Sequence, residues 1–278
     1  MTLICGRTKQ FDFFDKQLGH PDWAGKTVLD FGGNIGGFLR GAGDRFDPER
    51  YWCLDVAGEA LERGRQDFPR AHFVFYNRYS FEYNPEGIQG LPIPDLGRSF
   101  DYVLAFSVFN HTVREDMLAL VDQLRAMLKP EGVLAFTFND PLYGRVDHPD
   151  YDPAMTTWDV QQGNNLQRRL HRTHAREEGV DVEAMLAQAD GAAWCMLVND
   201  RLYVEPEDTA PLREEDGGYF LTYYTPAYVQ TLFPDAEILP PPRPEDRQHS
   251  CILKKSSLAS TLGVADHCET PPWSTVLP

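Results

Sequence analysis

The segment Val-Leu-Asp-Phe-Gly-Gly-Asn-Ile-Gly-Gly-Phe at residues 28–38 carries more chemistry than any other part of the chain. Its apolar start is typical of a buried strand, Asp30 adds a carboxylate near the strand end, and the glycines open a helix. Glycines let the main chain approach a ligand closely, and a helix N-terminus presents free N–H groups. The segment therefore predicts a site for a small polar ligand at Gly32, Gly33 and Gly36. The alternatives are a tight strand-to-helix turn without a ligand and Asp30 as a structural carboxylate that caps it.

A second carboxylate, Asp55, ends the next apolar run, Tyr51–Asp55, and an ordinary loop acid is its alternative interpretation. A nicotinamide fingerprint needs glycines at relative positions one, three and six. Here position three is Asn34, and position five, Gly36, is also glycine. The glycine spacing alone therefore does not identify the cofactor.

Metal and nucleophile patterns are weak elsewhere in the chain. His171 and His174 share one face of an expected helix, but the arginines around them favour a solvated basic face. Asp147, Asp150 and Asp152 beside His148 could hold a divalent ion, although such residues next to prolines equally describe a polar turn. The chain lacks a Gly-x-Ser-x-Gly elbow and a Gly-Lys-Ser/Thr phosphate loop, and its 5 cysteines show no metal-ligand spacing. We therefore expect no metal.

The elements that must position these residues follow a βαβ rhythm up to about residue 139. Short apolar runs predict strands at 27–31, 51–55, 72–76, 101–106 and 132–138. Residues 114–129 place apolar side chains on one stripe, which predicts an amphipathic helix that ends at Pro130. This pattern is typical of a parallel sheet covered by helices.

The rhythm breaks after Asp140, because residues 141–224 are far too many for an ordinary connection of ~2–6 residues. We expect an inserted unit with a basic helix at 165–178, a shorter helix at 180–187 and a hairpin pairing 194–198 with 201–204. The rhythm resumes with Thr225 as the N-cap of a helix at 226–233. Two last strands are expected at 236–239 and 250–254.

Composition limits the function classes. The 278 residues include 26 Lys and Arg against 42 Asp and Glu, a formal net charge of −16. Nucleic acids and anionic membranes would be repelled, which favours a small-molecule partner. No apolar run approaches the ~20 residues that cross a bilayer, and no secretory signal is evident, so a cytoplasmic protein is expected. The oligomeric state is left open.

The combination of Val28-Leu-Asp-Phe-Gly32 with Gly36 resembles motif I of the class I S-adenosylmethionine-dependent methyltransferases. The order of later segments agrees: Asp55 at a strand end, Phe100–His111 as a fourth strand, and the Leu128-Lys-Pro-Glu-Gly132 turn. The resemblance spans about residues 25–140. Asn34 departs from it where the family usually has glycine, and Tyr76-Asn-Arg-Tyr79 replaces the acidic residue that often follows strand three.

The resemblance implies a role for each matching residue in binding S-adenosylmethionine. Gly32, Gly33 and Gly36 would wrap the methionine portion, with Asp30 toward its ammonium group. Asp55, followed by Val56, would accept hydrogen bonds from both ribose hydroxyls. The remaining implied contacts are the adenine amine on Asn77 and the sulfonium beside the main chain of Phe106 and Ser107.

The fold class that follows is α/β: a doubly wound, mostly parallel, seven-stranded Rossmann-like sheet with an inserted cap subdomain. The expected divisions are an N-terminal helical lid segment (1–24), the cofactor-binding core (25–140), the cap (141–224), the return of the core (225–255) and a C-terminal tail (256–278).

The expected activity is methyl transfer from S-adenosylmethionine to an oxygen, nitrogen or carbon atom of a small metabolite. His111 is the preferred general base and His148 the second candidate, although His111 could simply bond nearby backbone. Tyr143, Trp158, Tyr223 and Tyr224 are expected to line the acceptor pocket, with a small core of the cap as the alternative. Two rival functions are other chemistry in the same fold, such as a nicotinamide oxidoreductase or a cyclase, and a non-catalytic cofactor-binding module.

Overall fold

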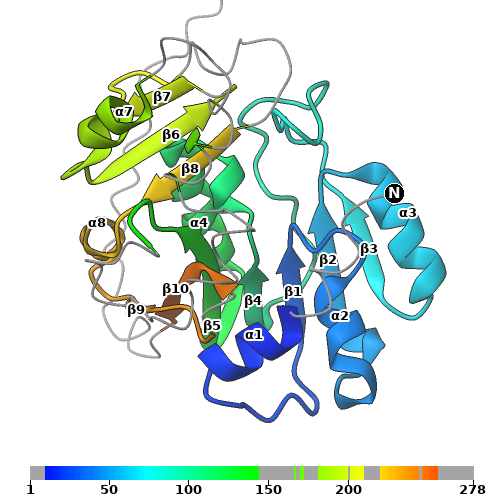
Figure 1. Cartoon of the computed structure of the whole chain (residues 1–278). Coiled ribbons are helices and arrows are strands. Elements are labelled where there is room, and N and C mark those ends of the chain that lie inside the picture. The colour runs from blue at the N-terminus through cyan, green and yellow to red at the C-terminus, as the bar shows by residue number, and fades with distance from the viewer. Residues whose placement is uncertain are drawn as a thin grey trace, which may run out of the picture.

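Parallel strands with helices on both faces form the centre of the molecule in the computed structural model (Figure 1). The structure describes residues 10–143, 166, 170–171, 181–199, 201–209, 220–243 and 246–255. The strands of the core are β1 (Val28–Phe31), β2 (Tyr51–Asp55), β3 (His72–Phe75), β4 (Phe100–Ala105), β5 (Leu128–Asn139), β9 (Glu237–Leu239) and β10 (Gln248–Lys254). The helices around them are α1 (Gln10–Gln17), α2 (Gly37–Ala42), α3 (Gly58–Asp67), α4 (Arg114–Ala126) and α8 (Pro226–Leu232), with short 3₁₀ turns η2 (Gly43–Arg45), η3 (Pro48–Arg50) and η4 (Phe109–His111).

The core strands lie in the order β3-β2-β1-β4-β5-β10-β9. The first five are parallel, and β10 is antiparallel to β5. This order confirms the doubly wound, mostly parallel sheet, in which the last strand of the sequence is reversed. Among the described residues the sheet holds ten strands rather than seven, because three strands of the insertion join it.

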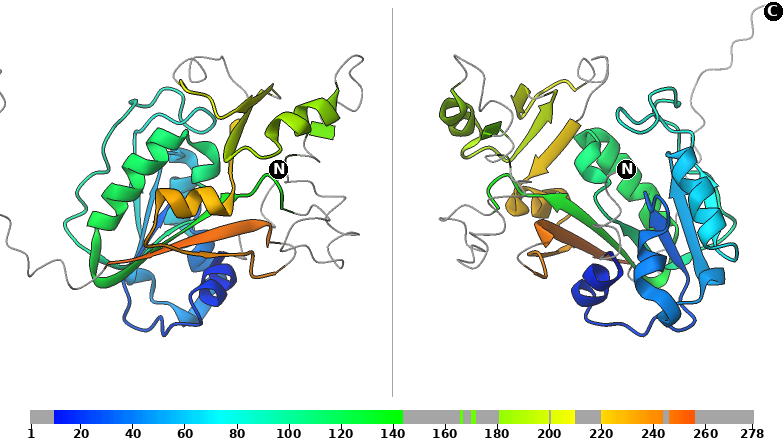
Figure 2. Two further views of the ribbon diagram at one scale, coloured as in Figure 1. Left: turned by 90° about the vertical axis from the view of Figure 1, so that its left-hand side faces the viewer. Right: turned by 45° about the vertical axis from the view of Figure 1, so that its right-hand side comes forward.

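Alternate residues of each strand face opposite layers, as the two-residue period of a strand requires. One layer holds α4 and α8 against side chains such as Leu29, Val103 and Phe136. The other layer holds α1, α2 and α3 against side chains such as Val28 and Leu104. Figure 2 shows α4 and α1 on opposite sides of the strands. The sheet is therefore buried on both faces, as the apolar runs predicted.

Helix α1 packs on α2 and on the end of β4, where the rings of Phe13 and Phe14 meet Phe106 edge-on. Its last turn is held by the segment after β9, because Lys16 and Gln17 donate to the carbonyl groups of Pro242 and Pro240. The expected N-terminal helix is thus present. Its role as a lid stays a prediction.

The described part of the insertion contains α7 (Val182–Ala189), β6 (Trp194–Val198), β7 (Arg201–Val204) and β8 (Phe220–Tyr224). The predicted hairpin is confirmed, since β6 pairs with β7 across Asn199, whose φ is 45°. Helix α7 begins two residues later than predicted, where Asp181 caps the Ala184 amide. Most of the expected helix at 165–178, the first residues and the expected tail lie outside the described residues.

Strand β8 was not predicted, and it connects the insertion to the core. It pairs with β6 along its whole length but with β5 through one residue pair, Asn139 with Tyr223. The insertion therefore extends the sheet beyond the carboxyl end of β5 (Figure 1). None of the described helices is long and apolar enough to span a bilayer.

Candidate functional site

The glycine turn after β1 lies at the carboxyl end of the sheet, and its backbone explains its residue types. Gly32 and Gly36 have φ values of 74° and 81°, and Asn34 has a φ of 55°. Glycine adopts this left-handed region freely and asparagine tolerates it better than most residues, which explains the Asn34 departure. A Cβ on Gly32 would lie 2.4 Å from Cγ2 of Val108, so the turn also packs tightly on the segment after β4.

Asp30 lies beneath this turn, in the interior. Its side chain is 1% exposed, and the hydroxyl of Tyr51 donates to its Oδ2 at 2.6 Å. Burial raises the pKa of Asp30 to about 7, the Tyr51 hydrogen bond lowers it, and the charge of Asp55 raises it further. A Cβ on Gly33 would lie 2.5 Å from the same Oδ2, so the turn closes directly over the carboxylate.

Asp55 joins the turn to the end of β2. Its carboxylate is buried, with Oδ2 accepting from the Asn34 amide at 2.7 Å and Oδ1 accepting from the Ala57 amide at 2.8 Å. These two hydrogen bonds fix the orientation of the carboxylate at the end of β2. Beside it, Val56 is half-buried and Phe75, in register with Asp55, exposes 47% of its surface.

The end of β4 holds a second unusual turn. Ser107 has a φ of 58°, and its amide donates to Oγ1 of Thr137 at 2.7 Å. Its Oγ accepts from Nδ2 of Asn110 and from Nε2 of Gln248, each at 3.1 Å. Sequence analysis named Phe106 and Ser107 but missed the three side chains that hold Ser107. Gln248 was missed because β10 begins two residues before the predicted strand.

His111 closes η4 and is half-buried. Its Nδ1 lies 3.1 Å from Oε2 of Glu82 and 3.2 Å from the carbonyl oxygen of Phe220, and the ring of Tyr83 meets it edge-on. The predicted histidine therefore connects the loop after β3 with β8. Glu82 carried no local signal in the sequence, because its pairing is set by the fold.

The other predicted residues lie in different places. Asn77 is exposed and its Oδ1 accepts from Asn84. Tyr143 is buried edge-on to His249, whose ring stacks on Phe138. His148 and Trp158 lie outside the described residues, as does the acidic cluster around His148.

Tyr223 and Tyr224 are fully buried on opposite faces of β8. Tyr223 belongs to an apolar cluster with Leu170 and Cys195. Tyr224 stacks on Trp194 and Tyr228, with ring centroids 6.3 and 6.4 Å apart. Both side chains thus pack in the interior of the insertion and its base, and their contact with an acceptor stays a prediction.

Within the described ranges, no group of three His, Cys, Asp or Glu side chains has the geometry of a metal site. Cys53, Cys195 and Cys251 are free and buried.

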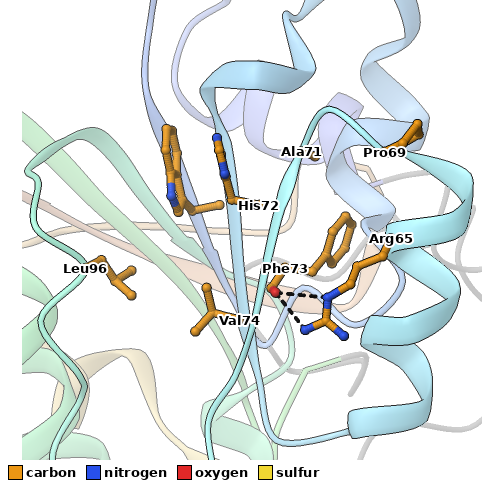
Figure 3. A pocket seen from close by; sticks show the side chains of 8 residues that line it. Arg65, Pro69, Ala71, His72, Phe73, Val74 and Leu96 are labelled. Carbon is orange, nitrogen blue, oxygen red and sulfur yellow. Dashed lines mark hydrogen bonds between the residues drawn. The ribbon is translucent and has the colours of Figure 1, made fainter.

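A hollow of about 500 Å³ lies along β3, the edge strand at the other end of the sheet from the insertion (Figure 3). The rings of Trp52 and His72 stack there at 4.2 Å, and Arg65 donates to the carbonyl oxygen of Phe73 from Nε and Nη2. No residue predicted for the site lines it. The chemistry-bearing residues are gathered instead at the carboxyl ends of β1, β2 and β4, where ligands of doubly wound sheets bind.

Comparison with known proteins gives this arrangement a family context. Residues 29–134 match the sequence model of a methyltransferase domain. No curated protein sequence matches the chain significantly. Among solved structures, a S-adenosylmethionine-dependent methyltransferase from Clostridium acetobutylicum is 12% identical with a TM-score of 0.50, over 91% of this chain and 93% of that one. The CcbJ methyltransferase from Streptomyces caelestis is 14% identical with a TM-score of 0.49, over 90% of both chains. At this identity, the first likeness establishes the fold.

Proposed function

Because residues 29–134 match the sequence model of a methyltransferase domain, we propose that the chain transfers a methyl group from S-adenosylmethionine to an oxygen, nitrogen or carbon atom of a small metabolite. The observation that supports this most is the glycine turn, which is closed onto Asp55 next to the constrained Ser107 turn. The two turns follow β1 and β4, which are neighbouring parallel strands, so both lie at the carboxyl edge of the sheet.

The residues at this edge fit the cofactor. The carboxylate of Asp55 lies at the carboxyl end of β2, where it would accept hydrogen bonds from the two ribose hydroxyls. The half-exposed ring of Phe75 and the side chain of Val56 offer apolar surface for adenine. The positive φ values of Gly32 and Gly36 shape a turn whose main chain would lie against the methionine portion of the cofactor. Asp30 would contribute its negative charge from below the turn to the ammonium group.

When bound, S-adenosylmethionine supplies a methyl group on a positively charged sulfur, so the protein's task is alignment in a dry pocket. The Phe106 and Ser107 main chain would lie beside that sulfur. Ser107 is held from three sides by Thr137, Asn110 and Gln248, which fixes the strand end within narrow limits. Strands β6, β7 and β8 extend beyond the carboxyl end of β5 and would help to exclude water.

His111 remains the preferred base for an acceptor that must lose a proton. A carboxylate such as Glu82, 3.1 Å from Nδ1, favours the tautomer with its proton on Nδ1. The Nε2 lone pair would then accept a proton. His148 stays the second candidate.

Titration calorimetry with S-adenosylhomocysteine tests the proposal. Asp55→Ala should weaken binding roughly ten- to a hundredfold, since a hydrogen bond to a charged group contributes ~1.5–3 kcal/mol. Asp235→Ala is the matched control, because it removes an exposed carboxylate that pairs with Arg125 away from this edge. Absence of binding to the wild-type protein would reject the function. A nicotinamide absorbance change on turnover would favour the oxidoreductase instead, and binding without any methylated product would favour the non-catalytic module.

A further inference from the structure

A buried polar cluster lies where the carboxyl ends of β4 and β5 meet the first residues of β10. It consists of Ser107, Asn110, Thr137, Gln248 and Ser250. Gln248 pairs in register with Asn139, and Ser250 pairs with Thr137. Because paired residues share a face of the sheet, the β10 side chains project on the same side as Thr137. The cluster adjoins the Ser107 turn of the proposed cofactor site.

The cluster is arranged around the hydroxyl group of Ser107. Its Oγ accepts hydrogen bonds from two amide groups, Nδ2 of Asn110 and Nε2 of Gln248. The side-chain amides of Asn110 and Gln248 thus each donate to Ser107 through nitrogen, and their oxygens do not take part in these hydrogen bonds. Gln248 lies 141 positions after Ser107 in the sequence, so the fold alone brings these two side chains together.

Those oxygens lack donors. Within the described part of the chain, Oδ1 of Asn110, Oε1 of Gln248 and Oγ of Ser250 are buried without a hydrogen-bond partner. The three residues are 1%, 9% and 0% exposed, so bulk water does not satisfy them. Buried acceptors without donors destabilise a fold, and a ligand that brings N–H groups would satisfy them.

We propose that the amide oxygens of Asn110 and Gln248 accept hydrogen bonds from the nucleophilic nitrogen of the methyl acceptor, which is a primary amine. This inference rests on the proposed function and names the substrate class of that same site. Two acceptors match the two N–H groups of a neutral primary amine and leave its lone pair for the attack. A hydroxyl acceptor has one proton and must lose it to a base, which an amide oxygen is not.

Two titratable side chains near the cluster, His249 and Asp140, are placed for different contacts. His249 lies between Gln248 and Ser250 in β10, so it projects to the opposite face, where it stacks on Phe138. Asp140 follows β5, and its Oδ1 accepts from the Leu142 amide. The side chains bonded to Ser107 are thus uncharged.

The transfer balances with these groups alone. The nitrogen lone pair forms the new N–C bond while the C–S bond breaks and its electron pair stays on sulfur. The positive charge moves from sulfur to nitrogen, and the N–H groups become stronger donors to the two amide oxygens as it does so. The methylammonium product then gives one proton to solvent.

Benzylamine and benzyl alcohol are matched probes, since they differ only in the group that would face the cluster. Their dissociation constants are measured by calorimetry on protein saturated with S-adenosylhomocysteine, at a pH near 9 so that neutral amine is present. We expect wild-type protein to bind the amine at least tenfold more tightly than the alcohol. Equal binding, or no amine binding, would overturn the proposal.

Substitutions test whether Gln248 and Asn110 cause the preference for the amine over the alcohol. Gln248→Met and Asn110→Leu should each reduce it roughly tenfold, while Asn110→Asp, which keeps an oxygen acceptor, should retain it. Gln123→Met is the matched control on α4, where Gln123 bonds the Ile93 amide. Undiminished preference in both Gln248→Met and Asn110→Leu would overturn the assignment to these residues.

The outcomes also separate the two proposals. Protein that fails to bind S-adenosylhomocysteine contradicts the proposed function itself. Protein that binds it, but treats amine and alcohol alike, contradicts only the amine assignment. Mass spectrometry of N-methylbenzylamine after incubation with S-adenosylmethionine then gives a readout of the transfer that is independent of binding.

Discussion

Replacing Asp30 with asparagine should make the protein more stable at alkaline pH while weakening cofactor binding. Burial, opposed by the Tyr51 hydrogen bond and reinforced by Asp55, raises the pKa of Asp30 from 3.8 to about 7. Between these two values the folded protein holds a proton that the unfolded chain has released. The free energy of unfolding therefore falls as pH rises through this window and levels off above about pH 7.

The size of the effect follows from the difference in pKa. The difference between 3.8 and about 7 corresponds to about 4 kcal/mol, since each pKa unit is equivalent to ~1.36 kcal/mol. The ionised carboxylate therefore lowers the free energy of unfolding by at most this amount above pH 7, and by nothing below the unfolded pKa. Asparagine keeps an acceptor for the Tyr51 hydroxyl and carries no charge. The stability gained by Asp30→Asn should therefore be about 2 kcal/mol larger at pH 8 than at pH 5.5.

Urea unfolding of both proteins at several pH values measures this difference. Asp95→Asn serves as the control, because it removes an exposed carboxylate. Calorimetry with S-adenosylhomocysteine on the same samples should show weaker binding to Asp30→Asn. Parallel profiles of unfolding free energy against pH for wild type and Asp30→Asn would refute the prediction that ionised Asp30 destabilises the fold.

Three further predictions concern the turn, the base and the cap. Gly32→Ala should destabilise the fold and weaken cofactor binding, because its Cβ would meet Val108; Gly90→Ala has the same backbone strain in open space and should lack the binding defect on calorimetry. For an acceptor that needs deprotonation, His111→Ala should lose at least ~100-fold in turnover at neutral pH with cofactor affinity retained, and a loss below about tenfold would favour His148 or alignment alone. Tyr223→Phe and Tyr224→Phe keep the packing of two fully buried rings, so thermal unfolding should change little, and a raised Michaelis constant for the acceptor would place a hydroxyl in its pocket.

Local signals explain what could be predicted from the sequence. The strand Tyr51–Asp55 and the hairpin around Asn199 agree with the predicted bounds, because apolar runs and a turn residue tolerant of positive φ delimit them. Thr225 caps α8 by accepting from the Tyr228 amide, as its place before Pro226 predicted. The cofactor turn was found for the same reason, since its residues are contiguous.

Residues brought together by the fold could not be predicted in this way. Gln248 reaches Ser107 across 141 positions, and Glu82 meets His111 only because the loop after β3 returns over η4. Strand β8 was missed because Phe220–Tyr224 is buried on both faces, so its aromatic residues show no alternation and were interpreted as pocket walls. The sheet was therefore expected to have seven strands, which is the number in its core order.

The position of β8 links the cap to the segment that would perform the chemistry. The Thr222 hydroxyl donates to the Thr112 carbonyl at 2.7 Å, and His111 Nδ1 lies 3.2 Å from the Phe220 carbonyl. Both contacts fall on η4 and the residue after it, and η4 also carries Asn110. We therefore expect a shift of β8 to displace η4, and with it Asn110, the residue proposed to bind the acceptor amine. If the insertion encloses the acceptor as proposed, the same movement of β8 would position Asn110 against it.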